Sequence, residues 1–266
     1  MTPEPRQRDD YEARQIRAAH RVLVDLGQVL ASFKDSIVIV GGWTPDLLLP
    51  HAEEPHIGSI DVDLALDAAR LGEGLYAQLI QLLLDTKRYK QEKAGKDFQL
   101  IAEVDMEDGE PAVRVEVDFL AAQQVKMKRN RPRLLKHFRV LQAEGCNVAF
   151  HAPVEIDIPG QNVRGSINTV HMRVVSLADF VLMKALAIGG RDKPKDVYDL
   201  CYALGEYPGG TAALAANWNQ RMTHQEVANA VSILREKFTG VNAFGPRQLV
   251  EFYNSPGKAE QDMQAR

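Results

Sequence analysis

The sequence of 266 residues predicts an α+β fold, a mixed sheet flanked by helices, followed by a C-terminal helical region. Short β-branched runs and strictly alternating segments in the first two thirds of the chain indicate strands. Amphipathic stripes between them indicate helices that cover a sheet. From Ser176 onward the periodicity is helical throughout. We therefore expect a core with an N-terminal helix over residues 1–175 and a helical region over residues 176–266.

Composition narrows the class of protein. Hydrophobic residues make up 45% of the chain and charged residues 26%, as in soluble globular proteins. No apolar run approaches the roughly 18 residues that a membrane span needs, and residues 1–10 lack the apolar core of a signal peptide. We expect a cytoplasmic protein without membrane contact. Cys146 and Cys201 have no metal-ligand spacing, so we expect reduced thiols and no zinc site.

The first predicted elements indicate a site that could bind a phosphate. Apolar residues at helical spacing predict a helix over residues 11–33, and residues 36–40 predict a buried strand. Gly41 and Gly42 follow this strand and permit torsions and close approaches that a Cβ would block. Thr44 is a plausible N-cap and Pro45 a first helical residue, so a helix N-terminus should lie above the glycines. Such a terminus can bind phosphate.

Two aspartates come next, on a second strand. After a loop over residues 50–59, side chains should alternate along the strand, so Asp61 and Asp63 share one face. Like charges at these positions repel each other, and a cation is the natural partner. Oxygen ligands of this kind suit Mg²⁺, which commonly bridges carboxylates to phosphates. The alternative is an exposed edge strand with two solvated acids, but the Gly-Gly turn upstream favours the metal site.

A later predicted strand also carries acidic residues. Residues 71–86 predict a helix, and residues 98–104 and 112–120 predict antiparallel strands joined by a turn over residues 107–110. The second strand alternates strictly, which leaves Glu116 and Asp118 on one face. Either acid can face the first two across the sheet.

A basic stretch follows directly, although the net charge of the chain is −4. Seven cations crowd into fourteen positions: Lys126, Lys128, Arg129, Arg131, Arg133, Lys136 and Arg139. The stretch is either a solvated connector or a surface that binds RNA phosphates or the phosphate tail of a nucleotide.

The rest of the chain predicts two strands and then helices. The strands should cover residues 147–158 and 166–174, with a turn at Pro159-Gly160. Helices are expected after Ser176, from Pro194, after a capping box of Thr223 and Glu226, and over residues 246–253. We place the boundary between the two regions near Val175.

The order hydrophobic-Gly-Gly, spacer, Asp-hydrophobic-Asp resembles the nucleotidyltransferases of the DNA polymerase β superfamily. The matching residues are 40–42 and 61–63. The resemblance implies a polymerase β-like core, in which the third acid closes a hydrophobic-Asp-hydrophobic-Leu pattern that Asp118 matches. It further implies that these three aspartates bind Mg²⁺ and act in catalysis. Nucleotide contacts would then come from Gly41, Gly42, Thr44 and Ser59.

Motifs in the C-terminal part narrow the resemblance from the superfamily to one family within it. Residues 176–187, followed by Arg191 and residues 195–200, look like motifs of the AbiEii-type nucleotidyltransferases, which include toxins of type IV toxin–antitoxin pairs. By this resemblance Lys184 and Arg191 would contact the nucleotide, and Asp196 would act near the acceptor as a base or orienting group. Asp199 would have a structural part. Relatives often place Arg where this chain has Ile57, with His56 beside it.

The leading hypothesis is thus a Mg²⁺-dependent enzyme that transfers NMP from ATP, GTP, CTP or another NTP to an acceptor. The resemblance suggests RNA, notably a tRNA end, as acceptor, and a possible role as a toxin with a cognate antitoxin. One alternative is a non-catalytic nucleotide- or RNA-binding regulator of the same fold, although three mutually repelling acids speak against it. A glycosyltransferase with a metal-binding Asp-x-Asp is disfavoured by the Gly-Gly turn.

Overall fold

The protein is represented by a computed structural model that describes residues 5–92, 96–122 and 140–253. A mixed sheet flanked by helices confirms the predicted α+β fold. The chain divides into two compact units, which we call the sheet unit and the helical unit. The sheet unit consists of Glu12–Leu47 and Gly58–Ser176, and the helical unit of Met1–Tyr11, Leu48–Ile57 and Leu177–Arg266. Residues 48–57, which the sequence placed in the core, thus belong to the helical unit.

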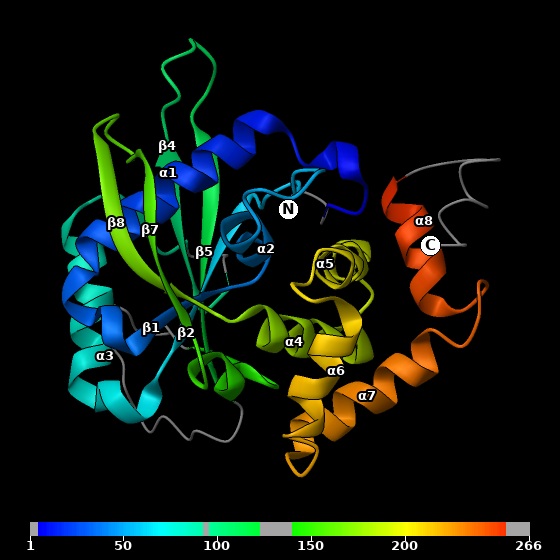
Figure 1. The fold of residues 1–266 in the computed structure, drawn as a ribbon. Coiled ribbons are helices and arrows are strands. Elements are labelled where there is room, and N and C mark those ends of the chain that lie inside the picture. Colours follow the sequence, from blue (N-terminus) through cyan, green and yellow to red (C-terminus); the bar gives the residue numbers. More distant parts are fainter. Residues whose placement is uncertain (1–4, 93–95, 123–139, 254–266) are drawn as a thin grey trace. The chain divides into compact units, whose positions relative to one another are not determined.

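In the described residues, eight strands form one sheet in the order β3-β4-β5-β2-β1-β8-β7, with β6 paired to β5 (Figure 1). The pairs β2–β5, β1–β8 and β5–β6 are parallel, and the others are antiparallel. The short strands β3 and β6 were not predicted. The bounds are β1 Ile37–Val40, β2 Asp61–Leu66, β3 Tyr89–Lys90, β4 Gln99–Val104, β5 Val113–Ala122, β6 Leu141–Ala143, β7 Val154–Gln161 and β8 Ile167–Val174.

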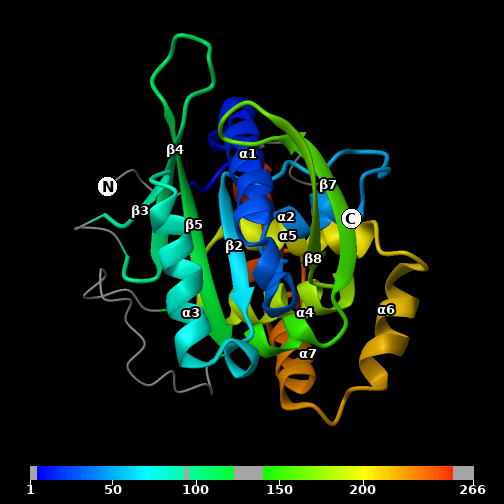
Figure 2. The same ribbon diagram turned by 90° about the vertical axis from the view of Figure 1, so that its left-hand side faces the viewer.

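Two long helices cover one face of this sheet (Figure 2). They are α1 (Ala13–Val29) and α3 (Ala68–Asp85), and both confirm predicted helices within a few residues. A 3₁₀ turn, η2 (Ala31–Ser36), extends the first helix toward β1. β5 alternates between buried and partly exposed residues along its length. One face of the strand therefore anchors to the core, and the other is available for polar side chains.

The predicted turn at Pro159-Gly160 is wrong, because β7 continues through both residues to Gln161. Pro159 pairs with Thr169 of β8. β7 is the last strand of the sheet, so a residue without an N–H is tolerated there. The turn instead lies at residues 162–166. The predicted strand also begins too early, since residues 146–150 form the 3₁₀ helix η3 (Cys146–Phe150).

The helical unit confirms the helical periodicity after Ser176. α4 packs against α5 and α7, and α5 packs against α8. One detail of the prediction is wrong, because α7 has His224 rather than Thr223 at its N-cap. The bounds are α4 Leu177–Gly190, α5 Pro194–Gly205, α6 Gly210–Asn219, α7 Gln225–Lys237 and α8 Phe244–Tyr253.

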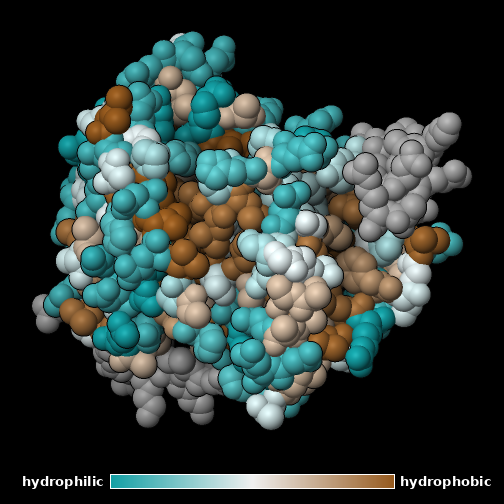
Figure 3. Space-filling view, in the orientation of Figure 1, coloured by the Kyte–Doolittle hydropathy of each residue, from teal (hydrophilic) through white to brown (hydrophobic). Residues whose placement is uncertain are grey.

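The surface in Figure 3 is mostly hydrophilic, and hydrophobic residues reach it in smaller areas. In the part of the chain that the structure describes, no helix has the length and apolar character of a membrane span. A few large hydrophobic side chains are exposed, two of them on α3, as is ordinary for folded chains. Within the described ranges they are Leu75, Leu82, Val154, Ile167, Met222 and Val241.

Candidate active site

The glycine turn and the first two predicted metal ligands meet at the junction of β1 and β2. These strands pair antiparallel, and Val40 lies opposite Asp63. Gly41 follows with a φ of 73°, a conformation that glycine adopts without strain. A Cβ at Gly41 would collide with Oδ2 of Asp63. The turn therefore requires glycine both for its backbone conformation and for the close approach of this carboxylate.

Strand β5 brings the third predicted acid beside the first two. β2 and β5 pair in parallel, with Asp61 beside Glu116 and Asp63 beside Asp118. Neighbours in a sheet share a face, as do residues two apart on one strand. Four carboxylates thus belong to one face of the sheet. The structure places the predicted ligands Asp61, Asp63 and Asp118 in neighbouring positions of this register.

The two acids of β5 differ in the charges around them. The carboxylate of Glu116 lies 3.4 Å from the guanidinium of Arg114 and 3.7 Å from Nζ of Lys96. Asp118 makes no ion pair of this kind with any residue that the structure describes. Its negative charge is the less compensated of the two, which favours Asp118 over Glu116 as the third metal ligand.

The surroundings of Asp118 raise its pKa to about 6. Burial of the carboxyl group is the largest cause, and the negative charges of Asp61 and Glu116 act in the same direction. A hydrogen bond from Gln99 and the charge of Lys96 oppose the rise. A carboxylate in this position gains from a nearby cation, because the cation stabilises its ionised form.

Gln99 belongs to this acidic face, and the sequence reasoning missed it. Gln99 begins β4, pairs with Asp118 and is only 4% exposed. Its Nε2 donates to Oδ1 of Asp118 and to Oε2 of Glu116, at 2.6 Å in each case. The sequence does contain a signal, since a single amide side chain starts a strand that is otherwise mainly apolar and pairs with the strand of the third acid.

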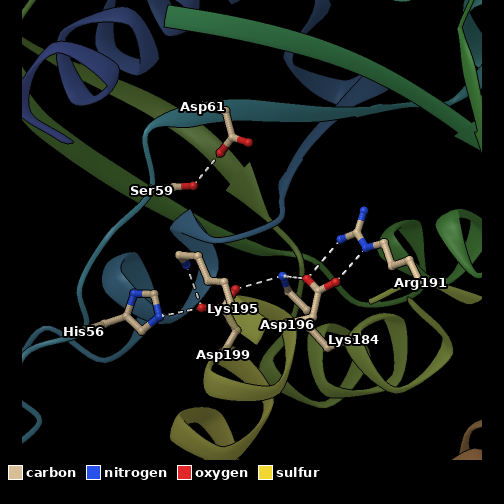
Figure 4. Close-up of polar contacts among 8 residues, drawn as sticks. All are labelled: His56, Ser59, Asp61, Lys184, Arg191, Lys195, Asp196 and Asp199. Carbon is tan, nitrogen blue, oxygen red and sulfur yellow. Dashed lines mark hydrogen bonds and ion pairs between the residues drawn. The ribbon is translucent and has the colours of Figure 1, made fainter. Parts of the chain in front are cut away.

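Ser59 and Trp43 hold the start of β2. Oγ of Ser59 donates to Oδ1 of Asp61 at 2.5 Å (Figure 4). The indole Nε1 of Trp43 donates to the backbone carbonyl of Asp61 at 2.7 Å. Ser59 was predicted to contact the nucleotide, and that contact stays a prediction. Trp43, which the prediction did not include, ties the residues after the glycine turn to the strand of the acids.

The predictions that Thr44 is an N-cap and Pro45 the first helical residue are wrong, because α2 (Trp43–Leu48) begins directly after Gly42. The N–H of Thr44 donates to the carbonyl of Gly41 at 3.1 Å, so Thr44 already lies inside the first turn. Its hydroxyl is buried and has no hydrogen-bond partner among the described residues. The positive φ of Gly41 lets the chain turn into the helix directly after Gly42. Nucleotide binding by Gly41, Gly42 and Thr44 stays a prediction.

The acidic face has the chemistry of a site for a hard cation, since carboxylate oxygens are the ligands that Mg²⁺ prefers. In the described ranges, no group of three or more His, Cys, Asp and Glu side chains could hold a metal ion as placed. Ser59 and Gln99 instead occupy one oxygen each of Asp61 and Asp118. The residue types and the strand register fit a divalent cation, and the metal site itself stays a prediction.

A second group of predicted site residues lies in the helical unit, where α4 and α5 pack together. Nζ of Lys184 lies 2.7 Å from Oδ1 of Asp196 and 2.8 Å from Oδ2 of Asp199. Arg191 donates to both oxygens of Asp196, at 2.6 Å from Nε and 2.9 Å from Nη2. Figure 4 shows these side chains pointing toward one another. The structure thus brings together the predicted residues Lys184, Arg191 and Asp196.

Asp199 joins further residues to this cluster. Its Oδ1 lies 2.7 Å from Nζ of Lys195 and 3.0 Å from Nε2 of His56 (Figure 4). The ring of His56 stacks on that of Tyr198, with 5.2 Å between the centroids. The backbone N–H of Ile57 also donates to the hydroxyl of Tyr198. These contacts anchor residues 48–57 on α5, which the loop-like sequence of this segment did not indicate.

Burial and the neighbouring charges determine the protonation states of the side chains in this cluster. Burial alone would lower the pKa of Lys184, but the carboxylates of Asp196 and Asp199 outweigh burial and raise it. Burial would likewise raise the pKa of Asp196, yet Lys184 and Arg191 lower it to about 2. The pKa of Asp199 is also lowered by its cationic neighbours, against burial. Burial is the main cause that lowers the pKa of His56, so this imidazole is neutral at pH 7.

The candidate nucleotide contacts divide between the two units. Gly41, Gly42, Thr44 and Ser59 belong to the sheet unit with the three acids, whereas Lys184, Arg191 and Asp196 belong to the helical unit. The basic stretch over residues 126–139 lies outside the described residues. Its proposed part in binding phosphate rests on sequence alone.

The chain is similar to known proteins both in its sequence and in its structure. The family described as "Nucleotidyl transferase AbiEii toxin, Type IV TA system" matches residues 58–254. Among solved structures, the chain is similar to an antigenic nucleotidyltransferase-like protein from Paracoccidioides brasiliensis. The TM-score is 0.47 and the identity 18%, over 83% of this chain and 89% of that chain. No curated protein matches the sequence. The family match spans both the acidic strands and the cluster of Lys184.

Proposed function

The chain belongs to the AbiEii family of nucleotidyl transferase toxins of type IV toxin–antitoxin systems, and from this we propose that it transfers NMP from an NTP to RNA. We propose a tRNA end as the acceptor, Mg²⁺ as the cofactor and a cognate antitoxin as a partner. Asp61, Asp63 and Asp118 are the proposed metal ligands and catalytic acids. Membership of this family supports nucleotidyl transfer by a toxin, and the metal and the RNA acceptor are parts of the proposal.

The observation that carries this proposal is the parallel register of β2 and β5. It sets Asp63 beside Asp118, and a carboxylate of this trio lies against the turn at Gly41. Burial and the neighbouring acids raise the pKa of Asp118, so a cation nearby would stabilise its ionised form. Mutually repelling acids on one half-buried face have no stabilising role of their own, so they support a catalytic function over a purely structural one.

In phosphoryl transfer, the protein mainly positions the reactants and stabilises the charges that develop. A bound Mg²⁺ would lower the pKa of the attacking hydroxyl group and neutralise charge on the leaving pyrophosphate. The chain's own part is to hold the three carboxylates on one face, with the carboxylate of Asp63 against the glycine turn. Backbone N–H groups of such a turn can bind the phosphates of an NTP.

The cluster around Lys184 supports a contact with the anionic substrate. Arg191 is the accessible member, since its side chain is 54% exposed while it is bonded to Asp196. It can bind a phosphate without breaking that bond, because a guanidinium has five donors. The pKa of Asp196, at about 2, makes this carboxylate a weak base. We therefore assign Asp196 the orienting role and not that of the general base.

An assay of nucleotidyl transfer tests the proposal. The purified protein is incubated with Mg²⁺, total RNA and each of the four NTPs in labelled form. The wild type should label RNA with at least one NTP, and Asp63→Ala should lose this transfer. Asp157→Ala is the matched control, because Asp157 is an exposed aspartate on β7 of the same sheet.

Three results bear on the alternatives. Labelled RNA that is absent without Mg²⁺ supports the proposal, and fractionation of the product shows whether tRNA carries the label. Binding of NTP or RNA without transfer would instead support the non-catalytic regulator. Transfer that survives in Asp63→Ala would contradict the assignment of the acids.

A further inference from the structure

Gln99 lies between the two acids of β5 and is buried. It starts β4, which pairs antiparallel with β5 and places Gln99 opposite Asp118. Its side-chain amide has two N–H donors, and the two carboxylates of Asp118 and Glu116 accept from the same nitrogen. Hydrogen bonds to ionised acceptors are stronger than those between neutral groups. The amide therefore fixes both side chains on their strand.

The two acids differ in how far their interactions depend on this amide. Glu116 also lies within ion-pair distance of Arg114 and Lys96, so it keeps charged neighbours without Gln99. Among the described residues, the side-chain amide of Gln99 donates the hydrogen bond to the carboxylate of Asp118. It takes Oδ1 and thereby sets the rotation of the carboxylate. The same position on β5 lies beside Asp63 of β2.

We propose that Gln99 is a positioning residue for the divalent cation site: its amide holds Asp118 by Oδ1, so that this carboxylate is orientated for a cation shared with Asp61 and Asp63. This inference rests on the proposed function. Partners of metal ligands fix ligand orientation, and their loss typically costs about 10–100-fold in metal affinity or activity. Gln99 acts through Asp118 and has no contact with substrate in this role.

The test measures binding of Mn²⁺, as a spectroscopic substitute for Mg²⁺, to the purified full-length protein without nucleotide. Free Mn²⁺ is followed by electron paramagnetic resonance. Gln99→Met keeps the length of the side chain and removes both donors, whereas Gln99→Asn keeps an amide on a shorter side chain. Asp118→Asn serves as the reference for loss of the ligand. Gln161→Met is the matched control, because Gln161 lies on β7 of the same sheet and bonds to Arg21 instead.

We expect Gln99→Met to weaken Mn²⁺ binding about 10-fold or more, Gln99→Asn to weaken it less, and Gln161→Met to leave it unchanged. The Mg²⁺ concentration for half-maximal transfer should rise in the same order, while KM for the NTP changes little. Thermal unfolding without metal shows whether each variant is folded. Gln99→Asn tests the proposal if Gln99→Met does not fold.

The outcomes separate this inference from the proposed function. If folded Gln99→Met and Gln99→Asn bind Mn²⁺ as the wild type does, while Asp118→Asn does not bind it, the role of Gln99 is overturned and the metal site stands. If the wild type itself binds no Mn²⁺, the metal site and the role of Gln99 are overturned together. Weakened binding in the two Gln99 variants alone supports the inference.

Discussion

At the scale of single residues, Gly41 carries two constraints at once. Its φ of 73° is a region that costs other residues about 1–3 kcal/mol, and an added Cβ would strike the carboxylate of Asp63. We therefore expect Gly41→Ala to lower the free energy of unfolding by about 1–3 kcal/mol. Displacement of Asp63 should also lower the rate of transfer by about 100-fold, since small shifts of a catalytic group are this costly. Urea unfolding and the RNA-labelling assay measure the two effects.

Gly74 provides the control for this substitution. It lies in α3, and a Cβ there would meet no atom within 4 Å. Alanine is favoured over glycine in a helix by about 0.5–1 kcal/mol, so Gly74→Ala should stabilise slightly and leave transfer unchanged. Full activity of Gly41→Ala would show that the turn can move away from Asp63.

Asp118 gives stability a particular dependence on pH. Its pKa is about 6 in the folded chain, above the ordinary value, so the folded state binds more protons between about pH 4 and 6. Stability should therefore fall as the pH rises through this window and then level off. Asp118→Asn removes the charge, and we expect it to raise the free energy of unfolding at pH 7.5 by about 1–3 kcal/mol, with little gain at pH 4.

Unfolding by urea at pH 4, 6 and 7.5 measures this dependence. If a cation occupies the acidic face, Mg²⁺ should stabilise the wild type at pH 7.5 and leave Asp118→Asn less affected. Equal destabilisation by Asp118→Asn at all three pH values would contradict this prediction, because it would mean that folding does not raise the pKa of Asp118.

At the scale of elements, α5 is held by charges that are buried. Asp199 is fully buried and lies next to Lys184, Lys195 and His56. Asp199→Ala would leave two lysines without this partner, and breaking a buried ion pair in this way typically costs about 3–5 kcal/mol. We expect a loss of that size in urea unfolding. Asp192→Ala is the control, because Asp192 is 61% exposed and its pair with Arg6 should contribute less than about 1 kcal/mol.

An unchanged unfolding midpoint for Asp199→Ala would show that the two lysines find other partners or lose their protons. The second possibility has its own signature, since loss of a proton on folding makes stability rise with pH. Comparison of unfolding at pH 7 and 9 distinguishes them.

Element types could be predicted well where one face is buried. The strict alternation of residues 113–119 predicted β5, and the apolar stripe of residues 71–86 predicted α3. The turn at Pro159-Gly160 failed because an edge position removes the usual penalty for proline in a strand. Whether a strand lies at the edge depends on the whole sheet and cannot be predicted from the local sequence. Strands of two or three residues, such as β3 and β6, are too short to show a period.

At the scale of the whole molecule, the sequence predicted three candidate acids but not how the fold holds them. Asp61, Asp63 and Asp118 follow from alternation and from the family resemblance. Their register depends on pairing between β2 and β5, which are about fifty residues apart in the chain. Gln99 was missed for the same reason, because its role depends on a partner on another strand. The buried contact between His56 and Asp199, 143 positions apart, was equally beyond local patterns.

The chain enters the helical unit more than once, and this has a practical consequence. Residues 48–57 interrupt the sheet unit, and His56 and Ile57 make their contacts with α5. A truncated protein that starts at Leu177 would retain all five of the described C-terminal helices but lose the imidazole beside Asp199. Division of the gene at one point therefore cannot yield an intact helical half, and separate expression of the two halves would split a tertiary structure that folds from non-contiguous pieces.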